Sequence, residues 1–327
     1  AIDLLTQQIE LCNAGASESV IVIASEDTDA ALQTTVVTAL ERIGCHVIHV
    51  SCLESQSELG HPVLSEMITR AEFAIDLVGN LTKSITSGEH RTDIRVLTLK
   101  CENIHELKRL VVSSGVARRA EALKRLATSS KEIKISSGAG SFLTAELSSA
   151  QYIMKTGITS QRDQFAEWPS GIFNIDLGRQ QINGELLLSP GDIFLETDHI
   201  LSNPIHLEIE SGNLVEILGD SADANLMRIH LENEPNVDTA YQLNGISLGL
   251  ALTRELQHDG LSGQELLQMG LDIHHAGWSS VNIGGSMTLT LKEATVLFDD
   301  QMIFESGELT GVLQPDPYEK SAAGIKS

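Results

Sequence analysis

The first half of the chain alternates short apolar runs with segments of helical periodicity. The apolar runs at residues 20–24, 46–50, 73–78 and 95–99 predict buried strands. A helical pattern over residues 28–43 follows the first run, with Asp27 and Thr28 as capping candidates and Gly44 closing it. This spacing is typical of a parallel sheet with crossover helices. We therefore expect an N-terminal three-layer α/β domain with a mainly parallel sheet over residues 1–150.

From about residue 150 the pattern changes to alternating segments that are punctuated by glycine. Residues 171–177, 184–188, 192–196, 205–210 and 214–218 predict strands, and residues 222–232 predict a helix. Asp299 and Asp300 predict a hairpin turn between apolar runs at 294–298 and 302–304. We expect a C-terminal α+β domain with antiparallel strands over residues 151–327, so that the α/β chain has two domains.

Charge and cysteine usage narrow the class of partners. The chain has 22 Lys and Arg against 45 Asp and Glu, a formal net charge of −23, which repels nucleic acid and anionic membrane surfaces. No run approaches the roughly 18 apolar residues of a membrane helix, and Ala1-Ile2-Asp3 does not open a signal peptide. The four cysteines form no Cys-x-x-Cys pair, so we expect free thiols. These features predict a cytoplasmic protein that binds neither nucleic acid nor a membrane.

Short motifs between residues 165 and 300 carry a family resemblance. In chain order they are Trp168-Pro169-Ser170-Gly171, Gly184-Glu185-Leu186, Gly191-Asp192-Ile193, the run 205–212, Gly245-Ile246-Ser247, Ile283-Gly284-Gly285 and Leu297-Phe298-Asp299-Asp300. This series resembles the second domain of the 2,5-dihydroxypyridine 5,6-dioxygenase family, which is related to the metallopeptidases called aminopeptidase T. The resemblance covers nearly the whole chain, because the strand and helix pattern of the first half also fits.

The resemblance implies a ferrous ion that opens a hydroxylated pyridine ring with O₂. In the family, a His, a Ser and an Asp hold this ion. The family's histidine falls here on Ser247, its serine near Ala276 and its aspartate on Thr288. Neighbouring positions also differ, with Thr82, Lys155 and Glu167 where the family has His, Glu and His. Neutral hydroxyls are poor substitutes for imidazole or carboxylate as iron ligands. The resemblance therefore predicts the family's framework without its iron site.

Our leading hypothesis is a small-molecule enzyme that needs no cofactor and hydrolyses or isomerises a small polar ring or amide. Lys155 and Glu167 would form the acid/base pair, and Ser247 would be the nucleophile or a hydrogen-bonding anchor. Residues at the substrate would be Thr82, Trp168, Ala276 and Thr288. Two structural alternatives stand beside these roles: Lys155 and Glu167 as a plain ion pair, and Trp168 as a core residue.

Two further hypotheses remain at this stage. The first keeps Fe(II) chemistry, as a ring-cleaving dioxygenase or metallo-hydrolase, with relocated ligands taken from His275, Glu196 and His199. His274 and His275 are adjacent on an expected strand, so at most one of them faces a given side. The second is a catalytically silent binding subunit beside an active paralogue. The resemblance also implies a homo-oligomer.

Overall fold

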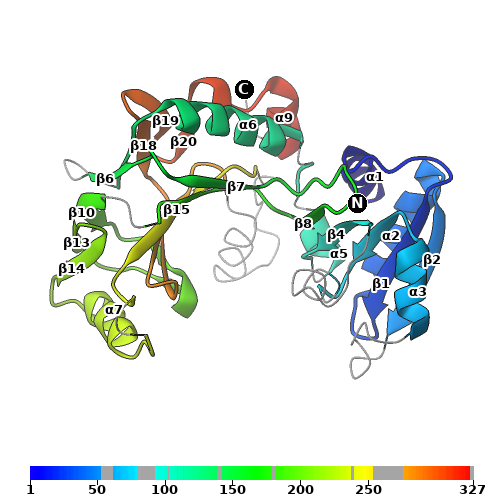
Figure 1. Cartoon of the computed structure of the whole chain (residues 1–327), viewed down its shortest axis with the longest axis horizontal. Coiled ribbons are helices and arrows are strands. Elements are labelled where there is room, and N and C mark those ends of the chain that lie inside the picture. Colours follow the sequence, from blue (N-terminus) through cyan, green and yellow to red (C-terminus); the bar gives the residue numbers. More distant parts are fainter. Residues whose placement is uncertain are drawn as a thin grey trace.

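The computed structural model describes residues 1–52, 62–79, 81, 93–101, 103–108, 110–112, 114–137, 142–178, 182–236, 239–252 and 275–324. This part of the chain forms an arch with two arms (Figure 1). One arm is built on a five-stranded sheet, sheet A, and the rest of the arch on an eight-stranded sheet B and a seven-stranded sheet C. The expected α/β class, with a parallel sheet and separate antiparallel sheets, is confirmed.

Sheet A is parallel throughout, in the order β2 (His46–Cys52), β1 (Ser19–Ser25), β3 (Phe73–Asp76), β4 (Arg95–Leu99) and β8 (Phe165–Trp168). Strand residues alternate between two apolar clusters. Val20 and Val22 pack in the cluster that includes residues of α1 (Ile2–Leu11) and α2 (Ala30–Ile43). Ile21 and Ile23 pack with residues of α3 (Pro62–Arg70) on the other face. The three layers follow directly from this alternation.

The start of α2 differs from the sequence expectation by two residues. Asp29 is the N-cap, and its side chain accepts a hydrogen bond of 2.6 Å from the backbone nitrogen of Leu32. The hydroxyl of Thr28 instead accepts a hydrogen bond of 2.9 Å from the backbone nitrogen of Ser25. Gly44 ends the helix at φ 94°, a left-handed conformation that glycine adopts without strain, as the sequence predicted.

Sheet B is antiparallel and runs in the order β14 (Asn213–Leu218), β13 (Ile205–Glu210), β10 (Ile182–Leu188), β6 (Leu143–Glu146), β5 (Glu132–Ser136), β18 (Thr295–Phe298), β19 (Gln301–Glu305) and β20 (Glu308–Leu309). Helix α7 (Ala222–Glu232) follows β14. The predicted hairpin turn is present between β18 and β19. Its residue Asp299 has φ 50° and accepts hydrogen bonds from the backbone nitrogens of Lys131 and Glu132.

Sheet C is also antiparallel, in the order β12 (His199–Ile200), β11 (Ile193–Phe194), β17 (Met287–Leu291), β16 (Ser279–Ile283), β15 (Leu243–Gly249), β9 (Ile172–Asp176) and β7 (Gln151–Lys155). Helices α6 (Ser114–Ser129) and α9 (Pro317–Ala323) lie above it at the top of the arch (Figure 1). A short helix, α5 (Ile104–Leu107), lies in the arm of sheet A.

Strands cross residue 150 in both directions. β5 and β6 precede it and belong to sheet B, whereas β8 follows it and pairs with β4 as the last strand of sheet A. Division of the chain into domains at residue 150 stays a prediction, and a cut there would separate strands that share a sheet. Among the described helices, none combines the length and the apolar character that crossing a bilayer requires.

Candidate functional site

The two faces of sheet C differ sharply in chemistry. On one face Tyr152 and Phe173 pack with the main core, and the Tyr152 hydroxyl donates a hydrogen bond of 3.2 Å to the carbonyl oxygen of Ala127 in α6. Because side chains alternate along a strand, the residues next to Tyr152 in β7 and next to Phe173 in β9 point to the opposite face of the sheet. That face is turned away from α6, toward the hollow of the arch (Figure 1). It is the candidate site.

Four uncharged polar residues form a line across this face, which we call the polar row. The strand register places Thr290 opposite Ser280, Ser280 opposite Ser247, and Ser247 opposite Asn174. Directly opposed residues of antiparallel strands share a face and have neighbouring side chains. The hydroxyls of Ser280 and Thr290 lie 2.8 Å apart in a hydrogen bond. The Asn174 Oδ1 atom is buried and has no hydrogen-bond partner within the described residues.

A second polar pair lies on the same face, two residues further along β16 and β17. The Thr288 hydroxyl donates a hydrogen bond of 2.9 Å to Asn282 Oδ1, and the Thr288 backbone nitrogen donates one of 2.7 Å to Glu196 Oε2. The register therefore places Ser247 and Thr288 on one face of one sheet. The hydrogen bond from the Thr288 nitrogen places Glu196 at the edge of that face. Their roles in binding stay predictions.

The residues near position 276 are closely packed. The Ala276 backbone nitrogen donates a hydrogen bond of 2.7 Å to the carbonyl oxygen of Ala251, and its methyl group is buried. The His275 ring lies 5.4 Å from the Trp278 ring, centroid to centroid. Burial lowers the pKa of His275, although a hydrogen bond with the Ala276 carbonyl opposes the shift. His275 is therefore neutral near pH 7.

Lys155 and Glu167 do not form the ion pair that the sequence suggested. Glu167 Oε2 lies 2.9 Å from the Nζ atom of Lys100, the residue that follows β4. Lys155, at the end of β7, is exposed and forms no ion pair within the described part of the chain. It lies two residues from Ile153, which is opposite Asn174, so Lys155 shares the face of the polar row. Sequence reasoning missed the pairing of Glu167 with Lys100, because it depends on the parallel pairing of β4 and β8, which are far apart in the sequence.

The remaining substrate positions have clear placements. Trp168 is 1% exposed and packs in the main core, which favours the core alternative over a role as a pocket wall. It precedes a cis peptide bond to Pro169, and the Ser170 hydroxyl donates a hydrogen bond of 3.1 Å to the Lys155 carbonyl oxygen. Thr82 lies outside the described residues, so its expected position near the substrate stays a prediction.

Next to the site, β9, β15, α6 and α9 meet at a closely packed point that we call the junction. Its residues are Arg119, Gly171, Leu250, Ala251 and Glu319. The buried Arg119 donates a hydrogen bond of 3.0 Å from Nε to the Leu250 carbonyl and one of 2.6 Å from Nη1 to Glu319 Oε1. The Leu250 backbone nitrogen in turn donates a hydrogen bond of 2.7 Å to the Gly171 carbonyl oxygen. A Cβ at position 171 would lie 2.5 Å from that of Ala251, so glycine is required there.

The structure does not gather the three residues that the sequence offered as relocated metal ligands into one group. His199, Glu196 and His275 are all described, and no group of three or more His, Cys, Asp or Glu residues suited to a metal occurs in the described part of the chain. His199 is committed to Asp223, with Nε2 and Oδ1 2.7 Å apart. Burial opposes ionisation of Asp223, but hydrogen bonds from His199, Ser202 and Asn203 outweigh it and lower its pKa to about 2. The three residues thus belong to separate contacts in the described part of the chain, and the iron-dependent alternative stays a prediction.

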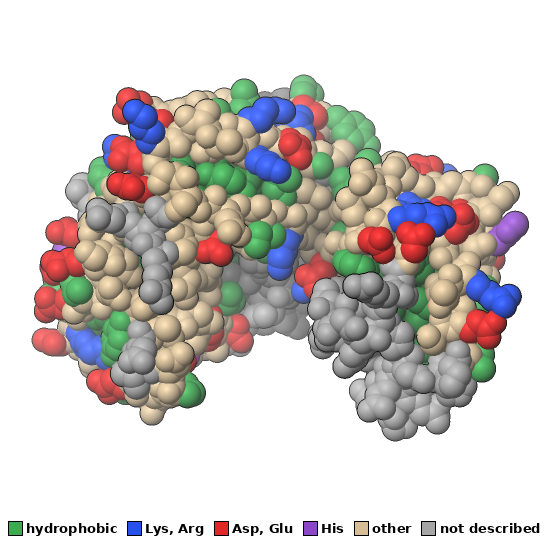
Figure 2. Space-filling view, in the orientation of Figure 1, with side chains coloured by type: hydrophobic (Ala, Val, Ile, Leu, Met, Phe, Trp, Pro, Cys, Tyr) green, Lys and Arg blue, Asp and Glu red, His purple; other side chains and the backbone are tan. Residues whose placement is uncertain are grey.

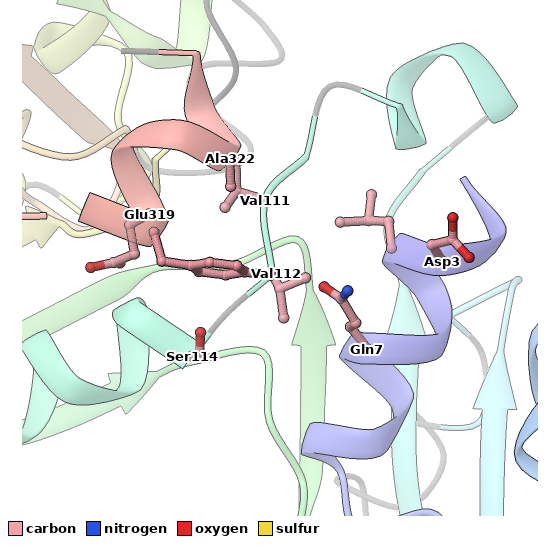
Figure 3. Close-up of a pocket in the computed structure, with 9 residues that line it drawn as sticks. Asp3, Gln7, Val111, Val112, Ser114, Glu319 and Ala322 are labelled. Atoms are coloured by element: carbon pink, nitrogen blue, oxygen red, sulfur yellow. The ribbon is translucent and has the colours of Figure 1, made fainter. Parts of the chain in front are cut away.

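A cavity of about 180 Å³ lies elsewhere, between α1 and α9 (Figure 3). It contains none of the residues that the sequence predicted for the site; its lining residues include Asp3, Gln7, Val111, Val112, Ser114 and Glu319. The Glu319 carboxylate is already paired with Arg118 and Arg119. The space-filling view shows the molecule hollowed between its two arms (Figure 2).

Comparison with known proteins agrees with this framework. The family model described as NicX, 2,5-dihydroxypyridine 5,6-dioxygenase, matches residues 1–265. The chain belongs to the 2,5-dihydroxypyridine 5,6-dioxygenase family. A 2,5-dihydroxypyridine 5,6-dioxygenase of Pseudomonas putida KT2440 is 25% identical over 259 residues, which are 73% of this chain and 72% of that protein.

Two solved structures resemble the fold of this family member. The structure of 2,5-dihydroxypyridine dioxygenase from Pseudomonas putida KT2440 has a TM-score of 0.70 at 20% identity and covers 95% of this chain and 96% of its own. Wild-type AmpT from Thermus thermophilus has a TM-score of 0.49 at 12% identity, over 95% of this chain and 100% of its own. The first confirms that the fold extends over nearly the whole chain.

The side chains at the family's ligand positions do not fit a ferrous ion. The resemblance puts those positions at Ser247, Ala276 and Thr288, and the structure shows a partly buried hydroxyl, a buried methyl and a hydroxyl that donates to Asn282. The ligand set that the resemblance implies includes an imidazole and a carboxylate, and these three positions supply neither. Glu196, which accepts from the Thr288 nitrogen, is a single carboxylate at the edge of the face. The residues that sequence reasoning missed are Asn174, Ser280, Thr290 and Lys100; polar residues in otherwise apolar strands were the available signal.

Proposed function

We propose that the chain is a small-molecule enzyme that binds a small polar ring or amide on the polar row and hydrolyses or isomerises it without a metal. The observation that carries this proposal is the row itself. Asn174 and Ser247 are half-buried and supply donors and acceptors without charge on the face turned to the hollow, and the row continues into the buried, hydrogen-bonded pair of Ser280 and Thr290. Uncharged partners of this kind suit a neutral compound with its own N–H, O–H and C=O groups, because an ion would lose its hydration there without compensation.

Ser247 is assigned the role of a hydrogen-bonding anchor. The nucleophile role needs a base within about 3 Å of the hydroxyl. The cross-strand neighbours of Ser247 are Asn174 and Ser280, and neither an amide nor a hydroxyl is a base at neutral pH. The geometry therefore favours the anchor over the nucleophile, which were both open from the sequence.

Proton transfer is assigned to Glu167 and Lys155, at the place where the chain passes from sheet A to sheet C. Glu167 lies in β8 with its Oε2 atom 2.9 Å from the Nζ atom of Lys100, a contact that orients the carboxylate for a role as general base. Lys155 lies on the polar-row face at the end of β7 and supplies a cation for charge that develops on a carbonyl oxygen. Atoms of a substrate anchored at Ser247 and Asn174 would lie between the row and these two groups.

Binding and turnover separate this proposal from its rivals. Purified protein is titrated by calorimetry against neutral hydroxypyridines, lactams and small amides, and turnover is followed by absorbance with and without added Fe(II) and O₂. We expect Ser247→Ala to weaken binding about tenfold, which corresponds to one lost hydrogen bond of about 1.4 kcal/mol. Ser160→Ala, a partly buried serine outside sheet C, is the matched control and should bind as wild type does.

Each rival hypothesis predicts a different outcome of these measurements. Turnover that requires added Fe(II) and consumes O₂ would contradict a metal-independent reaction. Binding at the row without turnover of any compound in the panel would favour the silent binding subunit. Turnover that survives both Lys155→Ala and Glu167→Ala would remove their assignment as the proton-transfer pair while leaving the binding site in place.

A further inference from the structure

The outer edge of sheet A has an exposed strand with apolar side chains. β2 lies at the end of the strand order β2-β1-β3-β4-β8, and only β1 pairs with it in the described sheet. All five residues of β4 and all four of β3 are buried, whereas β2 alternates between exposed and half-buried positions. Ile48, in the middle of the strand, is 47% exposed. The arch ends at this strand (Figure 1).

The backbone of β2 presents unpaired hydrogen-bonding groups outward. The His46 nitrogen donates a hydrogen bond of 2.8 Å to the Glu18 carbonyl, so this residue points toward β1. Successive residues of a strand direct their N–H and C=O groups to alternate sides, so Val47, His49 and Ser51 point away from the sheet. Within the described residues, no hydrogen bond outside the sheet involves the backbone groups of these three. They can pair with another strand.

The charge of β2 distinguishes it from the other edge strands of comparable length. Glu167 lies in β8, Glu216 in β14 and Lys155 in β7, and charged edge residues prevent strands of different molecules from pairing. β2, with the sequence HVIHVSC, contains no Asp, Glu, Lys or Arg. In a chain of net charge −23, this strand is where two copies approach with little repulsion.

We propose that β2 is the contact surface between two copies of this chain, joined edge to edge as antiparallel strands around a twofold axis at His49. In this register Val47 pairs with Ser51 of the second copy, and each hydrogen-bonded pair exchanges two backbone bonds. Ile48 lies opposite Val50 of the second copy, so the exposed apolar side chain meets another apolar side chain. A twofold contact requires a self-complementary surface, and the uncharged strand provides one. The two A sheets become one continuous sheet.

Light scattering coupled to size-exclusion chromatography tests this surface. We expect wild-type protein to have the mass of two chains or a multiple of two, and Ile48→Lys to halve that mass by placing a cation on each side of the paired strands. Val215→Lys is the matched control, because Val215 is 51% exposed on β14, the edge strand of sheet B. It should keep the wild-type mass. Circular dichroism and the thermal midpoint show that each variant is folded.

Hydrogen exchange of the unmodified chain gives a second measurement that depends on no variant. We expect the amides of Val47, His49 and Ser51 to exchange more slowly as protein concentration rises, while amides at the β14 edge stay unchanged. A monomeric wild-type protein, an unchanged mass for Ile48→Lys, or equal dissociation by Val215→Lys would overturn the proposal. Concentration-independent exchange at β2 would also overturn it.

Discussion

The junction lies beside sheet C, which carries the polar row, and the two regions are constrained in opposite ways. At the junction, the Arg119 guanidinium is buried and bound to the Glu319 carboxylate and the Leu250 carbonyl, and Gly171 packs against Ala251 with no room for a side chain. In the row, two uncharged side chains are half-buried and two are buried, and the Asn174 Oδ1 atom has no hydrogen-bond partner among the described residues. Packing determines residue identity at the junction, whereas the row can change its chemistry without loss of the fold.

The largest effect is expected from Glu319→Ala at the junction. The substitution leaves the Arg119 charge buried without its partner, and loss of one member of a buried ion pair costs about 3–5 kcal/mol. The free energy of unfolding in urea measures it. Arg118→Ala is the control, because Arg118 is 42% exposed and its pair with Glu319 is screened, with an expected cost of at most about 1 kcal/mol. Equal losses in both variants would mean that burial of the pair does not matter.

Gly171→Ala should have the next largest effect. The new Cβ would lie 2.7 Å from the Ala251 backbone nitrogen, so the backbone of β9 or the end of β15 must move, and such overpacking costs about 1–3 kcal/mol. Gly15→Ala is the control, since no atom lies within 4 Å of a Cβ built there. Its unfolding free energy should stay within about 0.5 kcal/mol of wild type. If Gly171→Ala left the free energy of unfolding unchanged, the junction would be able to accommodate the added methyl group.

Acid should destabilise the folded chain by protonating Asp223. Like Glu319 at the junction, the Asp223 carboxylate is buried and accepts several hydrogen bonds. Its folded pKa of about 2 lies below the ordinary value for Asp of about 3.9. A lowered pKa stabilises the folded chain above about pH 4, and this contribution, on the order of 2 kcal/mol, is lost as pH falls toward 2. Unfolding free energies between pH 5 and 2 follow it. Asp223→Asn should reduce the slope over this range, and an unchanged slope would contradict the assignment.

Ser247→Ala in the polar row should have the smallest effect on stability. Ser247 is half-buried, and among the described residues its hydroxyl has no hydrogen-bond partner, so its replacement should change the free energy of unfolding by less than about 1 kcal/mol. Asn174→Ala should behave in the same way. If either variant lost more than about 2 kcal/mol in urea unfolding, the row would be part of the structural framework and the contrast with the junction would fail.

Residues within single strands and helices were predicted well from sequence, and residues that pair between strands were not. The strand at 20–24 and the helix after it were found from apolar periodicity, with the helix start displaced from Thr28 to Ala30. Ser247 and Thr288 were predicted as site residues from the family resemblance, and the strand register places both on one face of sheet C. Lys100 was not foreseen as the partner of Glu167, since β4 and β8 pair across more than sixty intervening residues.

The sequence by itself determined that the first half alternates apolar strands with helices and that the second half is rich in short strands separated by glycine turns. These properties depend on residue type and local spacing. Tertiary structure decided that β8 completes sheet A, that Glu167 pairs with Lys100, and that Asn174, Ser247, Ser280 and Thr290 align in one row. Strand order and register arise from contacts between distant segments, whose free energies no local pattern contains.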